Sequence, residues 1–126
     1  MSLIVLAIDD SRTIREMLSA SLTEAGFTVH LAIDGRDGLD RLQEVAPDVV
    51  ITDINMPKLD GFGFIESARS MREWSAVPIL VLTTESASDL KERARNAGAT
   101  GWIVKPFDEV RLVAAIRRVA GMREAR

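Results

Sequence analysis

Five short runs of largely apolar residues punctuate this chain, and a segment with helical periodicity follows each of them. Runs that are apolar at nearly every position are typical of parallel strands that helices cover on both faces. The five expected strands are Leu3–Ile8, Phe27–Ala32, Asp48–Thr52, Val77–Leu82 and Gly101–Val104. This alternation predicts an α/β fold, in which five βα units form a doubly wound, five-stranded parallel sheet.

The five helical segments differ in how much apolar surface they can bury. The first is expected to turn Ile14, Met17, Leu18, Leu22 and Ala25 toward the sheet, before Gly26 ends it. The fourth, from Ala87 to Ala97, offers only one leucine and two alanines: Leu90, Ala94 and Ala97. Burying these stabilises far less than burying four large side chains, so we expect the fourth helix to be the most loosely anchored.

Size and composition limit the possible classes of protein. The 126 residues fit one domain, which we expect to span residues 1–126 without an appended effector domain. The absence of cysteine excludes disulfides and thiolate metal sites, and the net charge of −3 gives no reason to expect nucleic-acid binding. No apolar stretch is long enough for a transmembrane helix, and no basic region precedes the first run as in a signal peptide. We therefore expect a cytoplasmic protein that does not bind a membrane.

Four of the strands end on residues that can handle phosphate or metal. Asp9 and Asp10 follow the first strand, Asp53 the third, Thr83 the fourth and Lys105 the fifth. Ligands of open α/β sheets bind at the carboxyl ends of the strands where the strand order reverses, which for the order 2-1-3-4-5 lies between strands one and three. Asp10 and Asp53 would face each other there. Asp34, which ends the second strand at the sheet edge, would lie outside the pocket.

These residue types suit a divalent cation and phosphoryl transfer to an aspartate. Clustered carboxylates repel one another, and a hard cation such as Mg²⁺ relieves this repulsion with oxygen ligands and water. The cation also neutralises phosphoryl oxygens, so that an anionic nucleophile can approach an anionic substrate. Lys105 would add a second positive charge, and Thr83 would donate a hydrogen bond to a phosphoryl oxygen.

Each of these residues also has a purely structural explanation. Asp10 or Ser11 is suited to cap the first helix, and Asp53 to form the turn before Pro57. Asp9, Thr83 and Lys105 are common residue types for a loop, a strand end and a solvated surface. The functional hypothesis depends on all five meeting at one end of the sheet, which chance does not readily produce.

The chain resembles the receiver domains of two-component response regulators over essentially its whole length. The matching motifs are Asp9-Asp10-Ser11, Asp53-Ile54-Asn55-Met56-Pro57 with Asp60-Gly61, Thr83, and Lys105-Pro106-Phe107. The nearest resemblance within this family is to stand-alone chemotaxis regulators of the CheY type. It implies the flavodoxin-like strand order 2-1-3-4-5.

The resemblance also implies roles for these residues. Asp53 would accept a phosphoryl group from a phosphohistidine, and Lys105 would be its counter-ion. Mg²⁺ would bind Asp10, Asp53 and the backbone carbonyl of Asn55, with Asp9 binding through water. On phosphorylation, Thr83 would move toward the phosphoryl group and the aromatic at position 102, here Trp102, would turn inward behind it. The face formed by the fourth helix, fifth strand and fifth helix would then bind a partner.

Several functions remain open at this point. The leading hypothesis is a monomeric signalling switch, not an enzyme, which a sensor histidine kinase or phosphotransfer protein phosphorylates and a phosphatase can reset. Its output would be the flagellar motor switch, or it would serve as a phosphate sink or shuttle in another relay. A small Mg²⁺-dependent phosphatase with an aspartyl nucleophile is an alternative, but such enzymes place an Asp-x-Asp motif after the first strand. A flavodoxin-type cofactor module is another, but its phosphate loop needs bare amides and hydroxyls rather than two aspartates.

Overall fold

The computed structural model describes residues 2–124 and contains five strands that alternate with helices. In chain order the elements are β1 (Ile4–Ile8), α1 (Arg12–Glu24), β2 (Thr28–Ala32), α2 (Gly35–Val45), β3 (Val49–Thr52), α3 (Gly61–Ser70), a 3-10 turn (Arg72–Trp74), β4 (Ile79–Thr83), α4 (Ser88–Ala97), β5 (Gly101–Val104) and α5 (Glu109–Glu124). The predicted elements therefore all exist; the fifth strand has its predicted bounds, and the ends of the other four strands lie within two residues of the prediction.

The sheet is parallel throughout and has the strand order β2-β1-β3-β4-β5, which confirms the expected doubly wound topology. The register brings the ends of neighbouring strands level with one another. Ile8 pairs with Ala32 on one side and with Thr52 on the other, and Thr83 pairs with Val104. The residues that follow these positions consequently emerge at one edge of the sheet.

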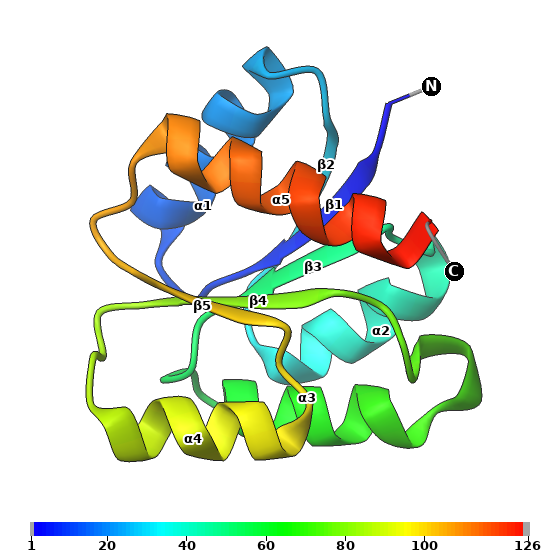
Figure 1. Cartoon of the computed structure of the whole chain (residues 1–126), viewed down its shortest axis with the longest axis vertical. Helices are drawn as coiled ribbons and strands as arrows, with labels where there is room; N and C mark the ends of the chain where they lie inside the picture. The colour runs from blue at the N-terminus through cyan, green and yellow to red at the C-terminus, as the bar shows by residue number, and fades with distance from the viewer. Residues whose placement is uncertain (1, 125–126) are drawn as a thin grey trace.

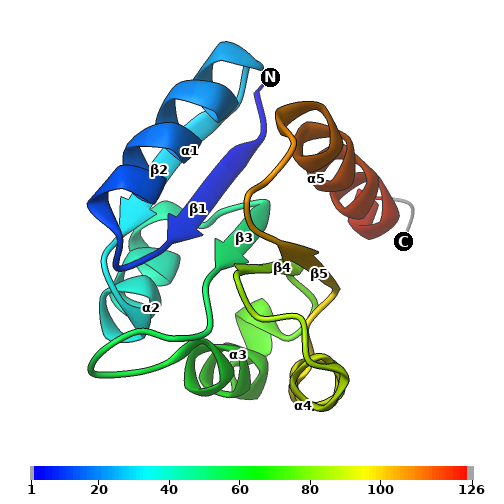
Figure 2. The same ribbon diagram turned by 90° about the vertical axis from the view of Figure 1, so that its left-hand side faces the viewer.

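Helices cover both faces of the sheet. Helices α1 and α5 lie on one face, and α2, α3 and α4 lie on the other (Figures 1 and 2). Each layer has its own apolar core: Leu18, Leu22, Leu112 and Ile116 pack beneath the first pair, and Leu42, Phe64, Ile65 and Ala94 beneath the other three. No helix within residues 2–124 is both long and apolar enough to cross a membrane.

Helix α1 presents a narrower buried stripe than its sequence suggests. Leu18 and Leu22 are buried, whereas Met17 is 48% exposed, so the prediction that Met17 faces the sheet is wrong. A helix turns about 100° per residue, and a position next to Leu18 lies off the stripe that Leu18 and Leu22 define. Ser11 caps this helix, because its Oγ accepts the amide N–H of Ile14 at 3.3 Å.

Helix α4 buries little apolar surface of its own, and polar and aromatic contacts with side chains of α3 also attach it to the domain. Of its residues only Ala94 is fully buried, and Ala87, the residue just before the helix, provides no side-chain cap. The Arg69 guanidinium donates two hydrogen bonds, of 3.0 and 2.8 Å, to the carbonyl of Gly98 at the other end of the helix. The Arg93 guanidinium lies 4.0 Å from the centre of the Phe62 ring.

We expect the amides of α4 to exchange with solvent faster than those of α3 and α5. Because α4 buries little apolar surface, the free energy of its local opening should be low, and its uncapped N-terminal end should open first. Native-state hydrogen exchange should show at least about tenfold lower protection in α4 than in α3. Equal protection in the two helices would contradict this expectation.

Candidate functional site

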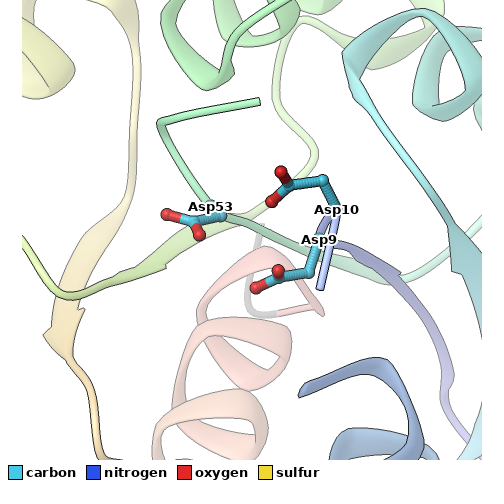
Figure 3. Close-up of side chains that lie close together, drawn as sticks. All are labelled: Asp9, Asp10 and Asp53. Carbon is cyan, nitrogen blue, oxygen red and sulfur yellow. The ribbon is translucent and has the colours of Figure 1, made fainter. Parts of the chain in front are cut away.

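Three carboxylates converge at the carboxyl ends of β1 and β3. One oxygen from each of Asp9, Asp10 and Asp53 lies within 4.8 Å of the others. The three side chains lie close together with their carboxylates directed to the same side, and the Asp10 oxygens are directed toward Asp53 (Figure 3). Backbone hydrogen bonds extend the sheet into the site, since Asp53 N–H donates to the Ile8 carbonyl at 3.0 Å and Asp9 N–H to the Ala32 carbonyl at 3.1 Å.

Lys105 joins two of these carboxylates from the end of β5. Its Nζ donates to Asp9 Oδ2 at 2.8 Å and to Asp53 Oδ2 at 2.9 Å. The peptide bond that follows, Lys105–Pro106, is cis. The Lys105 side chain is 10% exposed and the side chains of Asp9 and Asp53 are 2% and 13% exposed, so these ion pairs are largely shielded from water. Residues from opposite ends of the sequence thus form one charged cluster.

Burial and charge shift the ionisation of this cluster. Burial raises the pKa of Asp9 above its ordinary 3.8, and hydrogen bonds from Lys105 and the Ser11 amide offset part of that effect. Burial lowers the pKa of Lys105, but hydrogen bonds and charges of Asp53 and Asp9 raise it by more, so the net shift is upward from 10.5. The lysine is therefore held firmly in its charged form.

This upward shift predicts a loss of stability in alkali. A lysine whose folded-state pKa exceeds its unfolded value stabilises the fold fully below pH 10.5 and loses that contribution as pH rises through the folded-state pKa. Urea unfolding across this range should show the decline, and the Lys105→Met variant should show a flatter profile. The chain has no tyrosine or cysteine whose titration would overlap. A wild-type profile as flat as that of the variant would refute the prediction.

Thr83 and Trp102 are linked through Glu85, a residue that the sequence analysis did not identify. The buried Thr83 hydroxyl accepts the Glu85 N–H at 3.4 Å, and the Trp102 Nε1–H donates to the Glu85 carbonyl at 3.0 Å. The Glu85 carboxylate accepts the side-chain amide of Asn55 at 3.2 Å. Glu85 thereby connects the loop after Asp53, the loop after Thr83 and β5. A half-buried glutamate in the loop after a strand carries no sequence signal for such contacts.

The structure also separates structural from site residues. Asp34 lies outside the acidic cluster as expected, where its Oδ1 accepts the Asp37 N–H and caps α2. Of the two residues suited to cap the first helix, Ser11 is the one that does so, and the exposed Asp10 carboxylate makes no hydrogen bond or ion pair with any residue of the 2–124 range. Asp10 is therefore available to a ligand.

The cluster fits a hard divalent cation. Its donors are carboxylate oxygens alone, without sulfur or imidazole, as Mg²⁺ prefers. Lys105 offsets one negative charge among three, which leaves excess negative charge for a cation to neutralise. Asp10, which has no side-chain partner among the described residues, is the carboxylate that a cation can bind without breaking an existing bond.

A family model for the response regulator receiver domain matches residues 5–117. The doubly wound domain with an acidic pocket at its strand ends thus belongs to the receiver domain family of two-component response regulators. Among curated relatives, a probable chemotaxis protein CheY from Rhizobium etli is 37% identical over 118 residues, 93% of this chain and 92% of that protein. Response regulator MprA from Mycolicibacterium vanbaalenii is 39% identical over 113 residues, 90% of this chain, but the chain spans only 48% of its length. The chain likewise spans only 51% of the length of transcriptional regulatory protein PrrA from Mycobacterium leprae.

Solved structures of similar fold include chemotaxis protein CheY4 of Vibrio cholerae. It is 43% identical, with a TM-score of 0.90 and coverage of 94% of this chain and 99% of that one. The receiver domain of sensor histidine kinase PA1611 from Pseudomonas aeruginosa is 25% identical, with a TM-score of 0.89 and coverage of 96% and 99%. That structure contains a magnesium ion coordinated in its active-site cleft.

Proposed function

We propose that this chain is a phosphorylation-driven signalling switch in which Asp53 accepts a phosphoryl group from the phosphohistidine of a kinase or phosphotransfer protein. The observation that carries the proposal is the Lys105 ammonium bonded to Asp53 and Asp9 beside the free Asp10 carboxylate. Phosphoryl transfer needs a positioned oxygen nucleophile and positive charge around the phosphoryl oxygens, and the cluster supplies both.

Asp53 is held in one orientation before any substrate arrives. Its Oδ1 accepts the N–H of Ile54, its Oδ2 accepts Lys105 at 2.9 Å, and its backbone is tied to β1. In the proposed step an Asp53 oxygen forms a bond to phosphorus while the phosphorus–nitrogen bond breaks and the imidazole departs. Such preorganisation lowers the entropic cost of bringing the reacting atoms together.

Asp10, Asp53 and the Asn55 carbonyl would hold Mg²⁺, and Asp9 would bind it through water. A bound Mg²⁺ supplies positive charge that neutralises phosphoryl oxygens during transfer. The magnesium ion in the related Pseudomonas receiver domain supports this assignment. Lys105 would shift its hydrogen bond from Asp53 to a phosphoryl oxygen, since its ammonium already lies beside that carboxylate.

The response to phosphorylation would pass through Thr83 and Trp102. Movement of the Thr83 hydroxyl toward the phosphoryl group would release its long contact with the Glu85 amide, and Trp102 would follow because its indole is bonded to the Glu85 carbonyl. Two shallow hollows flank β5 and share Thr100, Gly101 and Trp102. Their shape would change with Trp102, which supports the face of α4, β5 and α5 as the partner surface.

Intact-mass spectrometry after incubation with acetyl phosphate tests the phosphoryl-acceptor function. We expect one added phosphoryl group per chain when Mg²⁺ is present and none when EDTA replaces it. A folded protein that gains no phosphoryl group under either condition would refute the proposal. Many cycles of phosphate-ester hydrolysis per molecule would instead favour the alternative of an aspartyl phosphatase.

For the output, we propose chemotaxis, with the flagellar motor switch as the partner and phosphorelay transfer as the alternative. The chain is 37% identical to the probable chemotaxis protein CheY of Rhizobium etli and 43% identical to chemotaxis protein CheY4 of Vibrio cholerae. The experiment is a pull-down of motor-switch proteins by this chain with and without beryllofluoride, a phosphoryl mimic. Binding only with beryllofluoride would support the proposal, and identical binding in both states would contradict a phosphorylation-controlled surface.

A further inference from the structure

The backbone that joins the first two carboxylates of the site is fixed by a side chain from helix α1. The β1 ladder ends at Ile8, so the carbonyl of the next residue, Asp9, has no strand partner within the described residues. The half-buried Arg15 reaches back from the first turn of α1, and its Nη1 donates to this carbonyl at 2.8 Å. A hydrogen bond from a charged donor to a carbonyl is stronger than one between neutral groups.

The Asp9 carbonyl belongs to the peptide group that leads into Asp10. Asp9 has its own side-chain partners, because its Oδ1 accepts the Ser11 N–H at 2.9 Å and its Oδ2 accepts Lys105. The Asp10 carboxylate has none among residues 2–124, so its direction depends on the backbone before it. Fixing the Asp9–Asp10 peptide plane therefore restricts the backbone from which Asp10 presents its carboxylate, and the Asp10 oxygens point toward Asp53 (Figure 3).

We propose that Arg15 is a positioning residue for the divalent cation: by holding the Asp9 carbonyl, it aims Asp10 into the acidic cluster. This inference rests on the cation site of the proposed function. Outer-shell hydrogen bonds of this kind commonly contribute about 10- to 100-fold to metal affinity. The contribution would be one of orientation, because Arg15 donates to the backbone carbonyl of Asp9 rather than to one of the carboxylates.

The same helix provides a matched control for charge. Arg12 lies one turn earlier, has a side chain that is 84% exposed, and pairs only with Glu16 on its own helix, at 3.0 Å. The Arg12→Ala substitution removes one positive charge, as Arg15→Ala does, but it leaves the hydrogen bond from Arg15 to the Asp9 carbonyl in place. A purely electrostatic role predicts similar effects at positions 12 and 15, whereas a positioning role predicts an effect at position 15 alone.

Isothermal titration of Mg²⁺ into the full chain, without any phosphodonor, tests the inference. We expect Arg15→Ala to weaken binding about tenfold, Arg15→Lys to recover part of the loss through its single N–H donor, and Arg12→Ala to change affinity by less than about twofold. Circular dichroism of each variant identifies those that remain folded, and affinities are compared among these.

A double-variant comparison shows whether Arg15 acts through Asp10. In an Asp10→Asn background, Arg15→Ala should have little further effect, because the carboxylate that it orients is gone. An Arg15→Ala protein that binds like wild type, or an equal loss in the Arg12→Ala protein, would overturn the positioning role while leaving the cation site intact. Failure of the wild type itself to bind Mg²⁺ would overturn both the site and the role of Arg15.

Discussion

Replacing Asp53 with asparagine is expected to abolish phosphoryl transfer from acetyl phosphate while leaving the fold intact. An amide oxygen is a poor nucleophile at neutral pH, so the acyl phosphate cannot form. The amide can still accept a hydrogen bond from the Ile54 N–H, and Lys105 keeps its bond to Asp9. Intact-mass spectrometry of the variant, under conditions that label the wild type, should show no added phosphoryl group.

Asp60→Asn is the matched control for this substitution. Asp60 lies on the same loop, where its Oδ1 accepts the Gly63 N–H and caps α3. Asparagine caps a helix about as well as aspartate, so this variant should be labelled like the wild type. If the Asp53→Asn protein still acquires the group, peptide mapping would identify another acceptor and refute the assignment of Asp53.

Lys105→Met is expected to destabilise the protein in EDTA and to bind Mg²⁺ more tightly. Removing one partner from a buried ion pair leaves uncompensated charge, and loss of a partner shared by two carboxylates should lower the free energy of unfolding by about 3 kcal/mol. A cation would then compensate the same carboxylates without competition from the ammonium. At about 100 times its dissociation constant, Mg²⁺ would restore roughly 2.7 kcal/mol.

Urea unfolding of Lys105→Met with EDTA and with saturating Mg²⁺ measures both effects. Lys91→Met removes an exposed lysine from α4 and should change stability little in either condition. The same destabilisation of Lys105→Met with and without Mg²⁺ would show that cation and lysine do not compensate the same groups. We also expect slower phosphorylation of this variant, because the phosphoryl oxygens lose a counter-ion.

The convergence of Asp9, Asp10, Asp53 and Lys105 was predictable from sequence because buried parallel strands carry a strong signal. An apolar run fixes where a strand ends, and the parallel order places those ends together. The thin apolar face of α4 was predictable for a similar reason, since it depends only on residue type and helical spacing.

Contacts made by polar side chains with distant backbone were not predictable. The bonds of Arg15 to the Asp9 carbonyl, Arg69 to Gly98 and Trp102 to Glu85 each depend on which carbonyl a loop leaves without a partner. No periodicity marks such groups, because the need arises only once the strands and helices are in place. Met17 was misplaced because an apolar residue at the border of a helical stripe is equally consistent with a buried and an exposed position.

The two tryptophans lie in different environments, so their intrinsic fluorescence can report on movement in the protein. Trp74 is 7% exposed and its Nε1–H has no partner within residues 2–124, whereas the indole of Trp102 is bonded to the loop that follows Thr83. Replacing Trp74 with phenylalanine removes an unsatisfied donor together with part of a buried ring, and leaves a single emitter at β5. The fluorescence of that variant would then follow ligand-dependent movement in real time, without an attached dye.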